Sequence, residues 1–299
     1  IASRSRSRSP CSTSGRCLTT LLRAGDSPVS APIFILKCSM LRTALLACAL
    51  SSQFANADDV GKYRTVTAVG DSITFGSCSS APGSYPCGTG DKAYAAVLQN
   101  DVLWDKNRTT YNINNYGASG TTATISGDYP YVETVEYQLA LTSNPDAVVM
   151  MLGTNDAKPQ NWGQGSYEED LTDLANTFLN LPSKPDLFMM VPPPLYSDGA
   201  YDMNQTVINS FLPEIVPRVA ESVGATVIDV FGEMGGTKDC ISVDCLDGYE
   251  LFCNHQSCDP CHPNDTGYVR MASIVFKVLY SDTMHNLGRP GEWPTLAEL

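Results

Sequence analysis

Two uninterrupted apolar runs constrain the fold of this 299-residue chain more than any other feature of its sequence. Residues 147–152 read AVVMML and residues 187–191 read LFMMV, with no polar side chain in either run. A strand with one face in water alternates apolar and polar side chains, whereas a strand covered on both faces is apolar throughout. The two runs therefore predict buried strands of a parallel sheet that lies between layers of helices.

The rest of the chain alternates predicted strands with predicted helices. Strands are expected at 65–69, 111–116, 146–152, 186–191 and 226–230. Helical periodicity is found at 93–103, 132–142, 167–181, 205–223 and 266–280, and Pro213 and Pro217 could kink the fourth helix. Five such units predict a single α/β domain with a doubly wound, flavodoxin-like five-stranded parallel sheet and helices on both faces.

Four polar segments fall where functional loops of such a domain are expected, at the carboxyl ends of strands or before the last helix. Each segment alone is ambiguous, because Asp and Ser before a helix often form only an N-cap and glycines often form only a turn. Their order along the chain is more specific and indicates one site. The segments are Gly70-Asp71-Ser72, residues 115–120 (NYGASG), Gly153-Thr154-Asn155-Asp156 and Asp259-Pro260-Cys261-His262.

The residue types in these segments suit a serine nucleophile. A serine hydroxyl needs an adjacent base, and that base needs a group that fixes its tautomer. The chain has three histidines. His285 follows the last predicted helix, and His255 lies in a cysteine-rich loop with no acid close before it. His262 has Asp259 three residues upstream, which makes it the best candidate for the base of Ser72.

The four segments, in this order and with these separations, resemble the four blocks of the SGNH (GDSL) hydrolase family, from about residue 65 to residue 280. The resemblance implies the SGNH hydrolase fold and hydrolysis of carboxylic esters through an acyl-enzyme, without a metal or organic cofactor. It also implies that Ser72 is the nucleophile, His262 the general base and Asp259 the carboxylate that orients it. The backbone N–H groups of Ser72 and Gly117 and the side-chain amide of Asn155 would form the oxyanion hole.

The segments after the third and fourth strands suggest a substrate class. Residues 153–162 and the triple proline 192–194 look similar to family members that remove acetyl groups from carbohydrates, such as acetylxylan and sialate O-acetyl esterases. Trp162 could stack on a sugar or could equally pack in the core, and Asp71 is a second candidate substrate contact. No long apolar lid segment is present, which favours a small acyl group. A lipid acyl hydrolase or thioesterase of the same family is the alternative.

Three other interpretations compete with an esterase. Cys258-Asp259-Pro260-Cys261-His262 matches the C-x-x-C-H signature of c-type haem attachment, in which His262 would bind iron. Cys253, Cys258 and Cys261 could instead bind zinc. A pseudoenzyme that only binds carbohydrate is the third interpretation, and the complete set of Ser72, Asp259 and His262 argues against it.

The charge is distributed unevenly along the chain. Residues 1–57 hold seven basic residues and one acid, a net charge of +6, whereas residues 58–299 hold twelve basic and 31 acidic residues, or −19. An acidic body repels phosphate backbones and anionic membranes, so nucleic acid is not an expected partner. A small-molecule or glycan ester is expected instead, and a neutral acetylated glycan fits this charge better than a sialylated one.

The N-terminal segment has the features of a targeting sequence. Met40, a basic residue at Arg42, a short apolar run and the triplet Ala55-Asn56-Ala57 predict a secretory signal peptide at 40–57, and the run is too short to span a membrane. Residues 1–39 are then a disordered leader or upstream sequence, 58–284 the hydrolase domain and 285–299 a tail. The alternative is that residues 1–57 form a transit peptide to an organelle.

Cysteines and glycosylation motifs agree with secretion. Seven of the 11 cysteines lie in the body, in closely spaced groups that suggest local disulfides, and an odd number leaves one cysteine unpaired within the chain. A bridge to Cys258 or Cys261 could fix the loop of Asp259. The disulfide candidates are Cys78, Cys87, Cys240, Cys245, Cys253, Cys258 and Cys261, and the glycosylation candidates are Asn107, Asn204 and Asn264.

Overall fold

In a computed structural model of the chain, the structure describes residues 62–79, 92–102, 111–238, 240, 246–252 and 259–280. The chain divides after Ala55, and all of these residues belong to the second unit, Asn56–Leu299. The predicted leader, signal peptide and C-terminal tail lie outside the described residues.

Five strands form one parallel sheet in the order β2-β1-β3-β4-β5. This order confirms the predicted doubly wound sheet. Each predicted strand is present, with ends that differ by at most two residues, and every residue of β3 is buried. The strands are β1 (Thr65–Gly70), β2 (Asn112–Gly117), β3 (Ala147–Met151), β4 (Asp186–Met190) and β5 (Thr226–Ile228).

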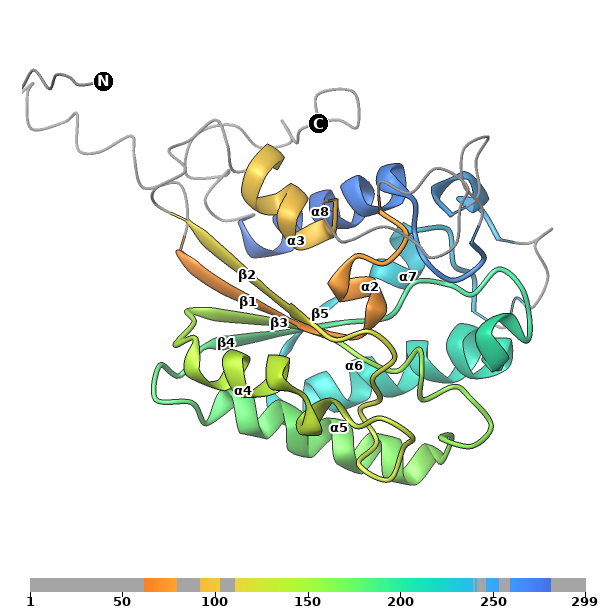
Figure 1. The fold of residues 1–299 in the computed structure, drawn as a ribbon, viewed down its shortest axis with the longest axis horizontal. Helices are drawn as coiled ribbons and strands as arrows, with labels where there is room; N and C mark the ends of the chain where they lie inside the picture. Colours follow the sequence, from red (N-terminus) through yellow and green to blue (C-terminus); the bar gives the residue numbers. More distant parts are fainter. Residues whose placement is uncertain are drawn as a thin grey trace, which may run out of the picture. The chain divides into compact units, whose positions relative to one another are not determined.

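Helices cover both faces of the sheet (Figure 1). One face is covered by α3 (Tyr94–Val97), the π-helical turn Leu98–Val102 and α8 (Asp265–Leu279). The other face is covered by α4 (Val135–Thr142), α5 (Gln164–Leu179) and α6 (Leu212–Val223). Two short helices, α2 (Ser72–Phe75) and α7 (Val230–Glu233), directly follow β1 and β5 and were not predicted, since four residues are too few to show a helical period.

The helical pattern predicted at 205–223 is divided in two. The π-helical turn Val207–Phe211 precedes α6, and Pro213 lies in the first turn of α6, where its missing N–H is tolerated. The helix continues past Pro217 without ending. The expected interruption therefore lies before Pro213.

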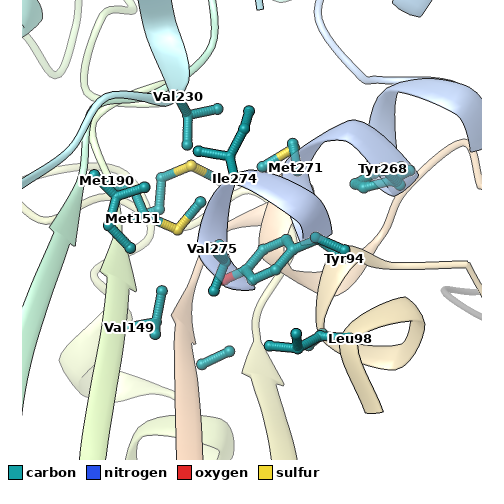
Figure 2. Packing of buried hydrophobic residues seen from close by; sticks show 14 of the residues in the cluster. Tyr94, Leu98, Val149, Met151, Met190, Val230, Tyr268, Met271, Ile274 and Val275 are labelled. Atoms are coloured by element: carbon teal, nitrogen blue, oxygen red, sulfur yellow. The ribbon is translucent and has the colours of Figure 1, made fainter. Parts of the chain in front are cut away.

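The core between the sheet and α8 holds the last helix in place (Figure 2). Apolar side chains of β3 and β4 pack there against one face of α8, and each is at most 4% exposed. Complete burial of one such side chain contributes about 1.5–3 kcal/mol. The loop that leads into α8 is thereby fixed to the sheet. The side chains are Val149, Met151, Met190, Met271, Ile274 and Val275.

No helix in the described parts of the chain is both long enough and apolar enough to cross a bilayer.

Candidate active site

Ser72 is the first residue of α2 and follows the carboxyl end of β1 (Figure 1). Asp71 caps this helix, since its Oδ1 accepts a hydrogen bond of 2.9 Å from the N–H of Ile73. A Cβ at position 70 would lie 2.4 Å from the carbonyl oxygen of Met151, so only glycine allows β1 to turn this close to β3. The cap and the glycine together fix the backbone that carries the serine.

The loop before α8 is held by its own side chains. The carboxylate Oδ1 of Asp259 accepts hydrogen bonds of 2.8 Å from the N–H groups of both Cys261 and His262. Asn264 caps α8 by accepting from the N–H of Gly267 at 3.0 Å. These short-range bonds account for the three-residue spacing between Asp259 and His262, because the carboxylate folds the chain back on itself.

The fold brings together the three residues for which the sequence predicts catalytic roles. His262 Nε2 lies 2.9 Å from Ser72 Oγ, and His262 Nδ1 lies 3.0 Å from Asp259 Oδ2. All three side chains are buried. In this arrangement the imidazole can accept the serine proton while the carboxylate holds the ring in the required tautomer.

Asp259 is suited to remain ionised. Burial alone would raise the pKa of its carboxyl group, but the hydrogen bond and the charge of His262, together with the hydroxyl of Tyr201, lower that pKa to about 2. A carboxylate that keeps its charge at neutral pH can stabilise an imidazolium formed during reaction. The sequence analysis missed Tyr201, which lies in no motif and 58 residues before Asp259.

Asn155 lies beside the loop that follows β2. Its Nδ2 donates a hydrogen bond of 3.1 Å to the carbonyl of Thr121, and a second hydrogen remains on the same nitrogen. The predicted role of Gly117 as an oxyanion donor is wrong, because the Gly117 N–H already donates to Asn115 Oδ1 at 2.9 Å. The absence of a side chain at Gly117 serves packing, since a Cβ there would lie 2.2 Å from the backbone nitrogen of Phe75.

Gly120, in the same loop, is a better candidate donor. Its φ of 87° is a conformation that favours glycine. No acceptor among the described residues binds its N–H, and it directly precedes the Thr121 that Asn155 contacts. The sequence offered two glycines in this segment, and only the hydrogen-bond pattern distinguishes them.

The two candidate substrate contacts, Asp71 and Trp162, lie in different environments. Asp71 is fully buried and caps α2, and burial raises the pKa of its carboxyl group to about 6 despite the Ile73 N–H and the charge of His262. Trp162 stacks on Phe211 with ring centroids 5.9 Å apart and also packs on Tyr167. Asp71 is therefore corrected to a structural role, whereas Trp162 is half-buried and its contact with a sugar stays a prediction.

Three of the seven cysteines of the body are described. Cys78 and Cys240 are disulfide-bonded, whereas Cys261 is buried and free, which contradicts its prediction as a disulfide cysteine. The expected bridge that fixes the Asp259 loop therefore does not use Cys261, whereas a bridge to Cys258 stays a prediction. Hydrogen bonds to Asp259 Oδ1 fix the described part of this loop. The other candidates, Cys87, Cys245, Cys253 and Cys258, lie outside the described residues.

Among the described residues, the atoms that could bind a metal or haem iron are engaged in other contacts. Cys78, Asp259 and His262 lie close enough to share a metal ion, but Cys78 is disulfide-bonded and the other two bind each other. Burial raises the pKa of the Cys261 thiol well above its usual range, which disfavours the thiolate that zinc requires. His262 Nε2 faces Ser72 rather than an open coordination position.

The glycosylation candidates differ in their surroundings. Asn204 is exposed. Asn264 is buried and uses both ends of its side chain, since Oδ1 caps α8 and Nδ2 donates to the carbonyl of Glu250 at 2.7 Å. Its prediction as a glycosylation site is therefore wrong for the folded protein. Asn107 lies outside the described residues.

The doubly wound parallel sheet carries a serine, a histidine and an aspartate within hydrogen-bond distance at its carboxyl edge. This arrangement defines the class of serine hydrolases with an α/β fold. Within that class, the chain belongs to the GDSL-like lipase/acylhydrolase family, whose model matches residues 68–270. This match confirms the family that the four sequence segments indicate.

Similar proteins include several carbohydrate esterases. A curated acetylxylan esterase from Xylanibacter ruminicola is 30% identical over 228 residues, which is 70% of this chain. The chain spans 42% of the length of that relative. Solved structures share the fold: an acetylxylan esterase from Geobacillus stearothermophilus has a TM-score of 0.50 at 20% identity, over 74% of this chain and 96% of the other. A carbohydrate acetylesterase from Sinorhizobium meliloti has a TM-score of 0.51 at 17% identity, over 75% and 99%.

Proposed function

We propose that this protein is a serine esterase that removes acetyl groups from carbohydrate. The observation that carries the proposal is the hydrogen-bond chain from Ser72 Oγ through His262 to Asp259 Oδ2, at 2.9 Å and 3.0 Å. Such a chain supplies an activated nucleophile and a general base for acyl transfer. Family membership supports the reaction class, and the names of the similar proteins support acetylated carbohydrate as substrate.

The proposed reaction has two halves. Ser72 Oγ attacks the ester carbonyl carbon while His262 Nε2 takes the serine proton, and Asp259 stabilises the imidazolium. The C–O bond to the sugar then breaks, and His262 returns the proton to the departing sugar hydroxyl. In the second half, His262 takes a proton from water, the water oxygen attacks the acetyl-serine, and acetate leaves as Ser72 regains its proton.

The negative oxygen of each tetrahedral intermediate needs donors that are already in position. We assign this role to the backbone N–H groups of Ser72 and Gly120 and to Asn155 Nδ2. The hydrogen bond from Asn155 to Thr121 supports this set, because it fixes the amide next to Gly120. Such donors lower the barrier most when they do not reorganise during the reaction.

The acyl-chain profile tests the proposal against its runner-up, a lipid acyl hydrolase or thioesterase. The rates of hydrolysis of p-nitrophenyl acetate, butyrate and octanoate are compared for the wild type and for Ser72→Ala. We expect the highest kcat/KM with acetate and no measurable turnover by the variant. A kcat/KM that rises with acyl length would favour the runner-up, and full activity of Ser72→Ala would refute the serine mechanism.

We further propose that the mature protein is secreted or lies in an endomembrane lumen, beginning near Asp58 and glycosylated at Asn204. The disulfide bonds of Cys78 and Cys240 support an oxidising compartment. Sequencing the N-terminus of the protein from its native host tests this proposal. A start near residue 58 in the secreted fraction is expected, whereas recovery from an organelle would indicate a transit peptide.

A further inference from the structure

The hydroxyl of Tyr201 reaches the charged end of the Ser72–His262–Asp259 chain. Tyr201 Oη donates a 2.5 Å hydrogen bond to Asp259 Oδ2, the same oxygen that faces His262 Nδ1. The Tyr201 ring also packs edge-on against the imidazole of His262, with centroids 5.2 Å apart. One side chain therefore touches both the base and the carboxylate that orients it. We propose that Tyr201 is a positioning residue that holds Asp259 and His262 in their reactive arrangement, an inference that rests on the proposed function.

The segment that carries Tyr201 is attached along the loop of Asp259. The N–H of Tyr196 donates to the carbonyl of Pro260 at 3.0 Å, and Met203 Sδ lies 3.8 Å from Cys261 Sγ. Contacts on both sides of Tyr201 thus join this loop after β4 to the loop before α8. The backbone that carries Tyr201 is therefore attached to the loop that carries Asp259 and His262.

The backbone at Tyr201 is held in an unfavourable conformation. Tyr201 has a φ of 53° and Asp202 a φ of 64°, both in the left-handed region that non-glycine residues avoid. Non-glycine residues in this region persist where surrounding contacts determine their position, and such positions cluster at functional sites. At Tyr201 the contacts include those to Asp259 and His262.

Tyr201 occupies the remaining acceptor capacity of Asp259. Oδ1 already accepts two backbone N–H groups, and Oδ2 accepts from Tyr201 and His262 while Cys78 Sγ lies 3.2 Å away. A hydrogen bond from a neutral hydroxyl shares the negative charge of the carboxylate. Without it, Asp259 would be more basic and would hold the imidazolium more tightly. The titratable groups facing Asp259 and His262 are Tyr201, Asp71, Cys261 and Tyr268, whereas Cys78 is disulfide-bonded and carries no titrating thiol.

The position of Tyr201 also explains why its effect should be separable from folding. Its side chain is 38% exposed and lies outside both core clusters, so removal of its hydroxyl leaves no cavity in the core. Phe at this position keeps the ring contact with His262 and loses the hydrogen bond to Asp259. Ala loses both contacts.

The test compares Tyr201→Phe, Tyr201→Ala and a matched control, Tyr249→Phe, with the wild type and Ser72→Ala. Tyr249 is likewise exposed, and its ring packs edge-on against Tyr196. Steady-state kinetics with p-nitrophenyl acetate are measured from pH 4 to 9, and thermal unfolding shows whether each variant folds. For Tyr201→Phe we expect kcat to fall about tenfold with KM nearly unchanged, which corresponds to one hydrogen bond to a charged group.

The pH profile separates positioning from a merely structural role. In Tyr201→Phe the acidic limb of kcat/KM should move to higher pH, because the Asp259 carboxylate loses a hydrogen bond that shares its charge. Tyr201→Ala should lose more kcat than Tyr201→Phe, and Tyr249→Phe should match the wild type. A Tyr201→Phe variant with the wild-type kcat and pH profile, beside an inactive Ser72→Ala, would overturn the proposal and leave the serine mechanism intact. Activity in Ser72→Ala would instead refute the proposed function.

Discussion

Two buried carboxyl groups close to His262 have opposite environments. Asp259 accepts hydrogen bonds through both oxygens, and its pKa is lowered to about 2, whereas burial raises the pKa of Asp71 to about 6. The difference follows from the number of donors around each group, since both side chains are buried. Asp259 is thus an anion at neutral and mildly acidic pH, whereas Asp71 changes its charge near pH 6.

The raised pKa of Asp71 predicts a stability penalty that grows with pH. The folded-state pKa exceeds the unfolded value of 3.8, so ionisation is less favourable in the folded state and stability falls as pH rises from about 4 to about 6. Asp71→Asn keeps an N-cap without the charge. Above pH 6 the wild type should have lost about 3 kcal/mol relative to this variant.

Chemical denaturation at pH 4, 5, 6 and 7 measures this difference. Asp229→Asn is the control, because Asp229 caps α7 through Gly232 but is exposed. If the free energies of unfolding of the wild type and Asp71→Asn changed in parallel across this pH range, ionisation of the buried carboxyl group would not lower stability.

The amide of Asn155 should act in the transition state. Asn155→Ala removes a donor aimed at the developing oxyanion, so kcat should fall about 10²- to 10³-fold while KM changes little. Asn180→Ala, which removes an exposed amide at the end of α5, is the control. If Asn155→Ala kept kcat within a factor of two of the wild type, Asn155 would have no role in the oxyanion hole.

Among the elements, the loop after β2 is fixed by hydrogen bonds from side chains of the loop after β3. Asp156 is fully buried and accepts hydrogen bonds from the N–H groups of Ala123 and Thr124, at 3.0 Å and 2.8 Å, and from the Thr124 hydroxyl at 2.7 Å. Its neighbour Asn155 binds Thr121 of the same loop. Two adjacent side chains therefore fix the segment that carries Gly120.

Asp156→Asn should loosen that segment. One carboxylate oxygen becomes an NH2 group that faces an N–H donor, so we expect a loss of about 1–3 kcal/mol in unfolding free energy and a lower kcat at temperatures where the variant remains folded. Asp170→Asn is the matched control, since Asp170 accepts from the N–H of Ile125 at the exposed end of the same loop. Equal effects of the two variants on kcat would contradict a specific role for Asp156.

Structure was predictable from the sequence where an apolar pattern was long or where two interacting residues lie close together in the chain. The apolar runs of β3 and β4 identified a buried parallel sheet, and the acid three residues before His262 identified this histidine as the candidate base. The donor choice between Gly117 and Gly120 was not predictable, because it depends on where the Asn115 side chain points. Tyr201 was not predictable either, since its contact with Asp259 joins two loops across 58 residues. The buried positions of Asp71 and Asn264 and the stacking of Trp162 on Phe211 likewise follow from tertiary packing.

For the whole molecule, the charge of −19 on residues 58–299 bears on substrate choice. Repulsion disfavours polyanionic substrates, and it weakens as salt screens the charges. A neutral acetylated polysaccharide is therefore expected to be a better substrate than a sialylated one. Acetate release from a sialylated substrate should increase with ionic strength, whereas release from xylan should change little. If acetate release from the sialylated substrate did not increase with ionic strength, substrate charge would not control binding.

The most direct test of the central claim is acetate release from acetylated xylan by the wild type and by Ser72→Ala at equal concentration. We expect steady acetate release by the wild type. The rate of the variant should be lower by a factor of at least about 10⁴, because loss of the nucleophile removes the whole Ser–His–Asp contribution. Equal rates for the two proteins, or no acetate from the wild type under conditions where it hydrolyses longer acyl esters, would contradict an acetyl esterase that uses Ser72.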